Sequence, residues 1–162
     1  GFCPDPAHVR DKDGIATSVV AASLVAALKA QGRSVWDELE RLARLHGLHV
    51  SSPLTFRVEQ IEQIASGMAR LRAQPPSVLA GSPVVEVSDL SQGYRGLPAT
   101  DGVLVLTEAG DRVIARPSGT EPKLKCYLEV ILAVAEGEPL PWEQARERLD
   151  AIKGAFAEII GL

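Results

Sequence analysis

Residues 113–130 read VIARPSGTEPKLKCYLEV. Apolar residues alternate with polar ones on each side of the Pro-Ser-Gly-Thr-Glu-Pro segment, which predicts two strands joined by a short loop. Within ten residues this loop gathers a guanidinium, two hydroxyls, a glycine and two ammonium groups, braced by two prolines. Polar chemistry is concentrated here, and we interpret the rest of the chain as the scaffold that presents the loop.

The segments around this hairpin predict an α+β domain. Alternating or short apolar runs indicate further strands, and longer amphipathic segments indicate helices. The expected strands are 54–58, 84–87, 103–106, 113–115 and 124–130, and the expected helices are 59–73 and 142–160. The order strand, helix, three or four strands, helix favours a mostly antiparallel sheet of four to five strands with two helices on one face.

The chain before residue 51 has a different character. Residues 15–30 are apolar on nearly every side, which predicts a buried helix. A second helix is expected from Ser34, with Asp37 as its capping partner, to Gly47. We expect sequence before Gly1 to supply the surface against which both helices pack. A polar segment with a proline at 48–53 is the expected hinge, giving domains 1–50 and 51–162.

Composition narrows the classes of partner. The chain has 162 residues, 46% of them apolar, and a net charge of −4, so it can bury a core and its surface as a whole does not suit nucleic acid. The longest apolar run, Ile15 to Leu28, is shorter than a membrane span and no signal peptide is visible. Two cysteines suit a reducing compartment. We therefore expect a cytoplasmic chain without nucleic-acid or membrane partners.

The loop has the chemistry that a phosphate requires. Arg116 offers a planar fork for two phosphate oxygens, and Ser118 and Thr120 offer hydroxyl donors. Gly119 lets the backbone approach a ligand closely, and Lys125 adds a point charge from the following strand. The alternative is that the segment is only a tight turn, since these residue types are common in turns.

Metal binding is the other chemistry to consider. Residues 11–14, Asp-Lys-Asp-Gly, have the composition of a calcium loop but not its spacing. His46 and His49 lie near a helix end, where a capping or surface role is more common than ligation. We predict no metal site in this chain. The loop is also not a P-loop, because the Gly-x4-Gly-Lys pattern is absent and a strand follows it.

The segment Arg116–Lys123 resembles the phosphate-binding loop of the α-D-phosphohexomutases, a family that includes phosphomannomutases and phosphoglucomutases. A second match supports the first. Residues 10–14, Arg-Asp-Lys-Asp-Gly, followed by an apolar helix, resemble the end of the sugar-recognition domain in the same family. The two matches occur in the family's order.

The resemblance implies an enzyme of four domains, of which this chain contains about the last third. Residues 1–50 would be the end of the third domain, and residues 51–162 the fourth, with a TBP-like fold. The whole enzyme would be a phosphotransferase and isomerase of carbohydrate metabolism, interconverting hexose 6-phosphate and hexose 1-phosphate through a hexose 1,6-bisphosphate, with Mg²⁺. The catalytic serine and the aspartate-rich magnesium loop are not in this sequence, so we expect no catalytic residue here and no activity from this chain alone.

By the same resemblance, the fourth domain holds the substrate phosphate that is not reacting and closes the active site. Arg116, Ser118, Gly119 and Thr120 match the family's phosphate contacts, and Lys125 occupies a position that is often arginine. Lys12 matches a lysine near the substrate phosphate in some members. The expected partners are a phosphosugar, mannose or glucose, the upstream domains and a second copy of the chain, since cut helices expose apolar surface. A phosphosugar-binding module without catalysis is the alternative.

Overall fold

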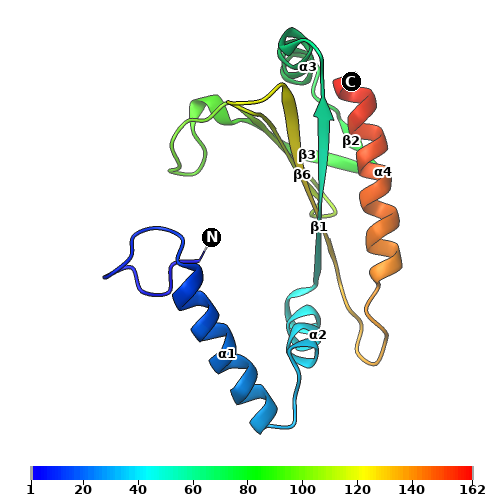
Figure 1. Ribbon diagram of the computed structural model, residues 1–162. Coiled ribbons are helices and arrows are strands. Elements are labelled where there is room, and N and C mark those ends of the chain that lie inside the picture. The colour runs from blue at the N-terminus through cyan, green and yellow to red at the C-terminus, as the bar shows by residue number, and fades with distance from the viewer. Residues whose placement is uncertain (1, 162) are drawn as a thin grey trace. The chain divides into compact units, whose positions relative to one another are not determined.

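The computed structural model describes residues 2–161 and divides into two compact units, Gly1–His46 and Gly47–Leu162 (Figure 1). The first unit is helical and the second is built on a sheet.

The first unit contains two helices, α1 (Gly14–Ala30) and α2 (Val35–His46). Both begin at a side-chain cap. The Asp13 carboxylate accepts a hydrogen bond from the Ala16 amide at 2.9 Å. Ser34 and Asp37 form the expected pair, because the Ser34 amide donates to the Asp37 carboxylate at 2.7 Å and the Asp37 amide donates to the Ser34 hydroxyl at 3.2 Å. Such caps satisfy amides that have no partner within the helix.

Both helices leave most of their apolar side chains exposed in this structure, so the burial expected for residues 15–30 is not observed here. In α1 only Leu28 is buried, whereas Ile15 is 85% exposed. In α2 only Ala43 is buried, and Trp36 is 77% exposed. Among the described residues no single helix is long and apolar enough to cross a membrane, although α1 and α2 reach the required length and hydropathy when taken together, across a bend of 91°.

The second unit confirms the α+β prediction. Its strands are β1 (Leu48–Arg57), β2 (Val78–Leu79), β3 (Ser82–Asp89), β4 (Val103–Thr107), β5 (Arg112–Pro117) and β6 (Lys123–Leu132). Its helices are α3 (Ile61–Ala73), the short 3-10 helix η1 (Leu90–Gln92) and α4 (Trp142–Ile160). The strands form one sheet in the order β1-β6-β5-β4-β3-β2, and every neighbouring pair is antiparallel.

The sheet has six strands rather than four to five. The additional strand is β2, whose two residues follow Pro75 and Pro76 and are too few to show an alternating pattern. Its inner residue, Leu79, is fully buried. The two expected helices are both present, and α4 has the predicted bounds.

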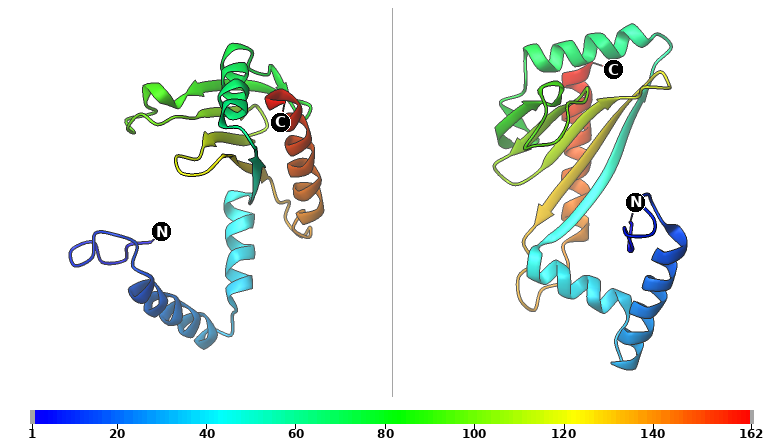
Figure 2. Two further views of the ribbon diagram at one scale, coloured as in Figure 1. Left: turned by 45° about the horizontal axis from the view of Figure 1, so that its top comes forward. Right: turned by 90° about the vertical axis from the view of Figure 1, so that its left-hand side faces the viewer.

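One face of the sheet packs on the helices. Along β6 every second side chain is buried, from Leu124 to Leu132. Helices α3 and α4 touch each other, and both contact β6 (Figure 2). The side chains that α4 buries are Ala145, Leu149, Ile152, Phe156 and Ile160. A covered face and an open face explain the alternation that the sequence shows.

The expected hinge at residues 48–53 is wrong. These residues are the first part of β1 and pair with Leu132 to Tyr127 of β6. Pro53 is compatible with a strand here because β1 lies at the edge of the sheet, where a missing amide donor is tolerated. The two units divide instead between His46 and Gly47.

Candidate functional site

The loop singled out by the sequence joins β5 to β6 at one end of the sheet. Arg116 pairs with Lys125, and Pro117 pairs with Leu124, in the antiparallel register. The hairpin is closed by the Ser118 amide, which donates to the Lys123 carbonyl at 2.9 Å. Residues 118–122 therefore form a short loop held at both ends by strand pairing.

The donors proposed for a phosphate lie at this loop and are accessible. Arg116, Gly119 and Thr120 are exposed, and Ser118 is half-buried. A β-carbon added to Gly119 would meet no atom within 4 Å. Crowding in the free protein therefore does not require a glycine at this position.

Side chains on the open face of the sheet extend the basic character of the loop. Residues directly opposite each other on paired strands point to the same face. In β1, Thr55 lies opposite Lys125 and Arg57 lies opposite Lys123. Two cross-strand rows therefore bring Arg57, Lys123, Lys125 and Arg116 to one corner of this face.

The charges at this corner are unequally matched. Lys123 forms an ion pair with Glu121, a residue of the loop. Within residues 2–161, Arg57, Arg116 and Lys125 have no ion pair. The pKa of Lys123 is lowered, first by desolvation and then by repulsion from Lys125 and Arg57. The corner therefore carries an excess of positive charge.

Sequence reasoning missed Arg57 as part of this site. It is 59 positions from Arg116, and only the pairing of β1 with β6 brings it to the same corner. The signal available in the sequence was the alternation of residues 54–58, which puts Thr55 and Arg57 on one face. That alternation does not reveal which strand lies alongside.

The segment between β3 and β4 passes close to the backbone of β5 beside Arg116. Gly102 precedes β4, and a β-carbon on it would lie 3.1 Å from the Ala115 carbonyl oxygen and 3.9 Å from the Arg116 β-carbon. Arg72 of α3 holds this segment through Asp89 at 3.0 Å and Asp101 at 2.5 Å. The pKa of Asp89 is lowered, chiefly by the Ser91 amide and also by Arg72.

Lys12, the remaining candidate, belongs to the first unit and lies in the loop before α1. Its ammonium is 2.9 Å from the Asp11 carboxylate, whose pKa it lowers by hydrogen bonding. In the part of the chain that the structure describes, no three His, Cys, Asp or Glu side chains are grouped so that they could hold a metal ion.

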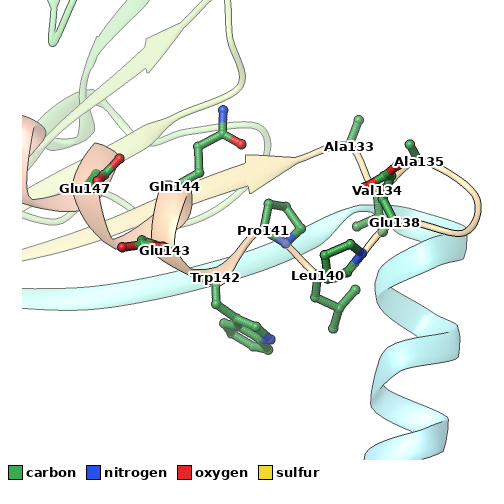
Figure 3. Close-up of a pocket in the computed structure, with 11 residues that line it drawn as sticks. Ala133, Val134, Ala135, Glu138, Leu140, Pro141, Trp142, Glu143, Gln144 and Glu147 are labelled. Carbon is green, nitrogen blue, oxygen red and sulfur yellow. The ribbon is translucent and has the colours of Figure 1, made fainter.

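A hollow of about 550 Å³ lies at the opposite end of β6 from the loop (Figure 3). Leu140, Pro141 and Trp142 line it together with carboxylates of α4, including Glu143 and Glu147. Carboxylates repel a phosphate. This hollow therefore does not compete with the loop as a candidate for phosphate.

The fold and the loop define an α+β domain whose unpaired basic side chains gather at one hairpin. The sequence profile described as phosphoglucomutase/phosphomannomutase, C-terminal domain, matches residues 56–140. The chain therefore belongs to the phosphoglucomutase/phosphomannomutase family and contains its C-terminal domain, as the resemblance predicted.

Individual relatives agree with this assignment. A probable phosphomannomutase of Haemophilus influenzae is 40% identical over 129 residues, and a phosphoglucomutase of Staphylococcus haemolyticus is 34% identical over 144 residues. In each case the match covers 80% of this chain and 26% of the relative. The chain thus spans about a quarter of the length of these relatives.

A solved structure has the same fold. The open form of pp63/parafusin, an exocytosis-sensitive phosphoprotein and phosphoglucomutase from Paramecium, matches with a TM-score of 0.60 and 17% identity. The match covers 96% of this chain and 29% of that one.

Proposed function

We propose that the β5–β6 loop binds the phosphate of a hexose phosphate, and that this chain is the C-terminal part of a phosphohexomutase. The observation that carries the proposal is the pairing of Arg116 with Lys125 on an exposed face, with no acidic partner for either among residues 2–161. Ser118, Gly119 and Thr120 adjoin this pair in the loop.

The donors suit a phosphate monoester, which carries close to two negative charges and three acceptor oxygens. Arg116 bonds two oxygens, Lys125 contributes charge without direction, and the loop hydroxyls and amides take the rest. A charge-assisted hydrogen bond contributes roughly 1.5–3 kcal/mol, so loss of Arg116 weakens phosphate binding on the order of tenfold to a hundredfold.

In the whole enzyme this domain holds the phosphate that is not reacting. Binding energy from that remote group orients the sugar and favours closure of the active site. Lys12 is a further contact to the substrate in this proposal. The reacting serine and the Mg²⁺ that assists phosphoryl transfer belong to upstream domains, with a hexose 1,6-bisphosphate as the intermediate. This chain alone is therefore inactive, and the whole enzyme is cytoplasmic.

A titration of the 162-residue chain tests the site. We expect millimolar glucose or mannose 6-phosphate to shift the backbone amide resonances of residues 118–120, and Arg116→Gln to abolish most of the shift. The matched control is Arg112→Gln, because Arg112 lies on the same strand and face but is paired with Glu129 at 2.8 Å. Unshifted resonances at 118–120 in the unsubstituted chain would contradict the site.

The second candidate is a phosphosugar-binding module without catalysis. The shortness of the match to its relatives, 26% of their length, keeps this candidate open. The source reading frame distinguishes the two candidates, because a mutase needs a serine loop and an aspartate-rich metal loop upstream of this domain. If the protein encoded by that frame has mutase activity that Arg116→Gln abolishes and Arg112→Gln leaves intact, the enzyme is the correct candidate.

A further inference from the structure

We propose that Arg57, acting with Lys123, makes the phosphate site selective for dianionic esters over monoanionic ones. This inference rests on the proposed function, since it assigns a specificity-determining role at the same site. Arg57 lies on the edge strand β1, outside the segment that identified the site.

The strand register carries the argument. Arg57 and Lys123 are directly opposite on β1 and β6, one row beyond Thr55 and Lys125. On its other side, Lys123 is bonded through its carbonyl to the Ser118 amide at 2.9 Å. The row Arg57–Lys123 therefore leads directly into the phosphate loop, and both residues lie on the same sheet face as Arg116 and Lys125.

Lys123 is mostly covered and lies among cations. Its side chain is 12% exposed, although two of its charged neighbours are the cations Lys125 and Arg57. Like charges on adjacent strands destabilise a sheet. Glu121 balances only one of these charges. A fold that maintains such a cluster in its free state is suited to a ligand that brings the missing negative charge.

The Arg57 side chain is available to interact with a bound phosphate ester. It is exposed and has no ion pair or hydrogen bond within the described chain. A hollow of about 720 Å³ is lined by Thr55, Arg57, Glu59 and Gln60 among others. Of the nearby acids, Glu121 pairs with Lys123 and Glu59 lines the same hollow as Arg57, so the four cations outnumber these two carboxylates.

The excess charge favours one class of ligand. Arg116 and Lys125 alone suffice to balance a dianion, and more than balance a monoanion. The field of Arg57 and Lys123 acts in proportion to the ligand's charge, so it stabilises a phosphate ester about twice as strongly as a sulfate ester of the same shape. Loss of Arg57 should therefore lower the preference for phosphate, not only the affinity.

The test compares glucose 6-phosphate with glucose 6-sulfate at about pH 8, where the phosphate ester is a dianion. Both are titrated into the 162-residue chain and followed at residues 118–120. We expect Arg57→Gln to weaken phosphate-ester binding by about threefold to tenfold and the sulfate ester by less, with Arg57→Lys restoring most of the preference. Arg112→Gln, on the same face, should leave both affinities unchanged.

The outcomes separate the two proposals. Equal affinities in Arg57→Gln and the unsubstituted chain, or equal weakening of both esters, would overturn the role of Arg57 while leaving the loop as the site. An unchanged response in Arg116→Gln would overturn the site itself. Urea denaturation midpoints of the variants check folding, and Lys123→Gln provides a second substitution in the same row.

Discussion

Arg116 and Lys125 occupy directly opposed positions on β5 and β6, so two cations face each other across a strand pair. Opposed like charges cost a sheet a few tenths of a kcal/mol to about 1 kcal/mol. The chain thus keeps at its loop an arrangement that folding alone does not favour. Departures of this kind from what folding favours are expected at functional sites.

This relationship predicts opposite effects on stability and on binding. Lys125→Gln should raise the free energy of unfolding of the free chain by a few tenths of a kcal/mol, because it removes the repulsion. It should also weaken binding of a phosphate ester, though less than Arg116→Gln does, because lysine contributes no fork. Urea denaturation measures the first effect and amide-shift titration the second. A lower free energy of unfolding for Lys125→Gln than for the unsubstituted chain, measured without ligand, would contradict the repulsion between Arg116 and Lys125.

Gly102 predicts a second effect on the site. In Gly102→Ala the new β-carbon would press on the Ala115 carbonyl and, at 3.2 Å, on Leu90. We expect a cost of about 1–3 kcal/mol together with weaker phosphate binding, because Arg116 follows the displaced strand. Gly154→Ala is the matched control, since a β-carbon there meets nothing within 4 Å and alanine favours the α4 interior by about 1 kcal/mol. Equal free energies of unfolding for Gly102→Ala and Gly154→Ala would count against a steric requirement for glycine at position 102.

A buried carboxylate predicts the largest loss of stability. Asp111 is fully buried at the β4–β5 turn, and Arg148 of α4 donates to it at 2.9 and 2.7 Å. Arg148→Ala leaves this charge buried without its cation, at a cost of about 3–5 kcal/mol in the free energy of unfolding. The exposed Arg146→Ala, two residues earlier on the same helix, should change stability by less than about 0.5 kcal/mol. Urea denaturation of both variants makes the comparison.

The two cysteines, both free thiols, predict a pH effect. Burial raises the pKa of Cys126 to about 12 from a value of 9.0. In the folded chain Cys126 should therefore react slowly with a thiol reagent at pH 8, while the partly exposed Cys3 reacts readily. Because the folded pKa is raised, the stability that Cys126 contributes is complete below about pH 9 and declines as the pH rises towards 12. Rapid reaction of both thiols in the folded chain at pH 8 would refute the prediction that Cys126 is protected.

The exposed apolar face of α1 predicts self-association of the isolated chain. Val20 and Leu24, one helical turn apart, are 55% and 51% exposed. Sedimentation velocity should show oligomers that increase with concentration, and replacing both residues by lysine should reduce them. Leu97→Lys, at a residue 66% exposed in the second unit, is the control. A monomer at every concentration would contradict the prediction.

The α+β class and the helix bounds could be predicted because they depend on local periodicity. Helix α4 shows an amphipathic pattern that needs no knowledge of its partner. The position of Arg57 could not be predicted, because it depends on which strand pairs with β6. The hinge was misplaced for a related reason. Ser51, Ser52 and Pro53 have turn composition, and long-range pairing overrides that local preference.

The loop chemistry was accessible from the sequence because its donors are contiguous. The features that support it are not contiguous. Gly102, just before β4, lies close to Arg116, and Arg72 of α3 forms an ion pair with Asp101. No local sequence pattern reveals such long-range contacts of a glycine or an arginine. The contacts that surround the loop therefore become known only from the structure.

The connection between the units leaves little room for substitution. Only Gly47 separates the last residue of α2 from the first residue of β1. It has a φ of +93°, and a β-carbon there would lie 3.0 Å from Ile131, so the connector is itself packed on the sheet. One residue spans at most about 3.6 Å. The connector therefore has almost no slack, and a side chain at position 47 would be strained both by the positive φ and by the contact with Ile131.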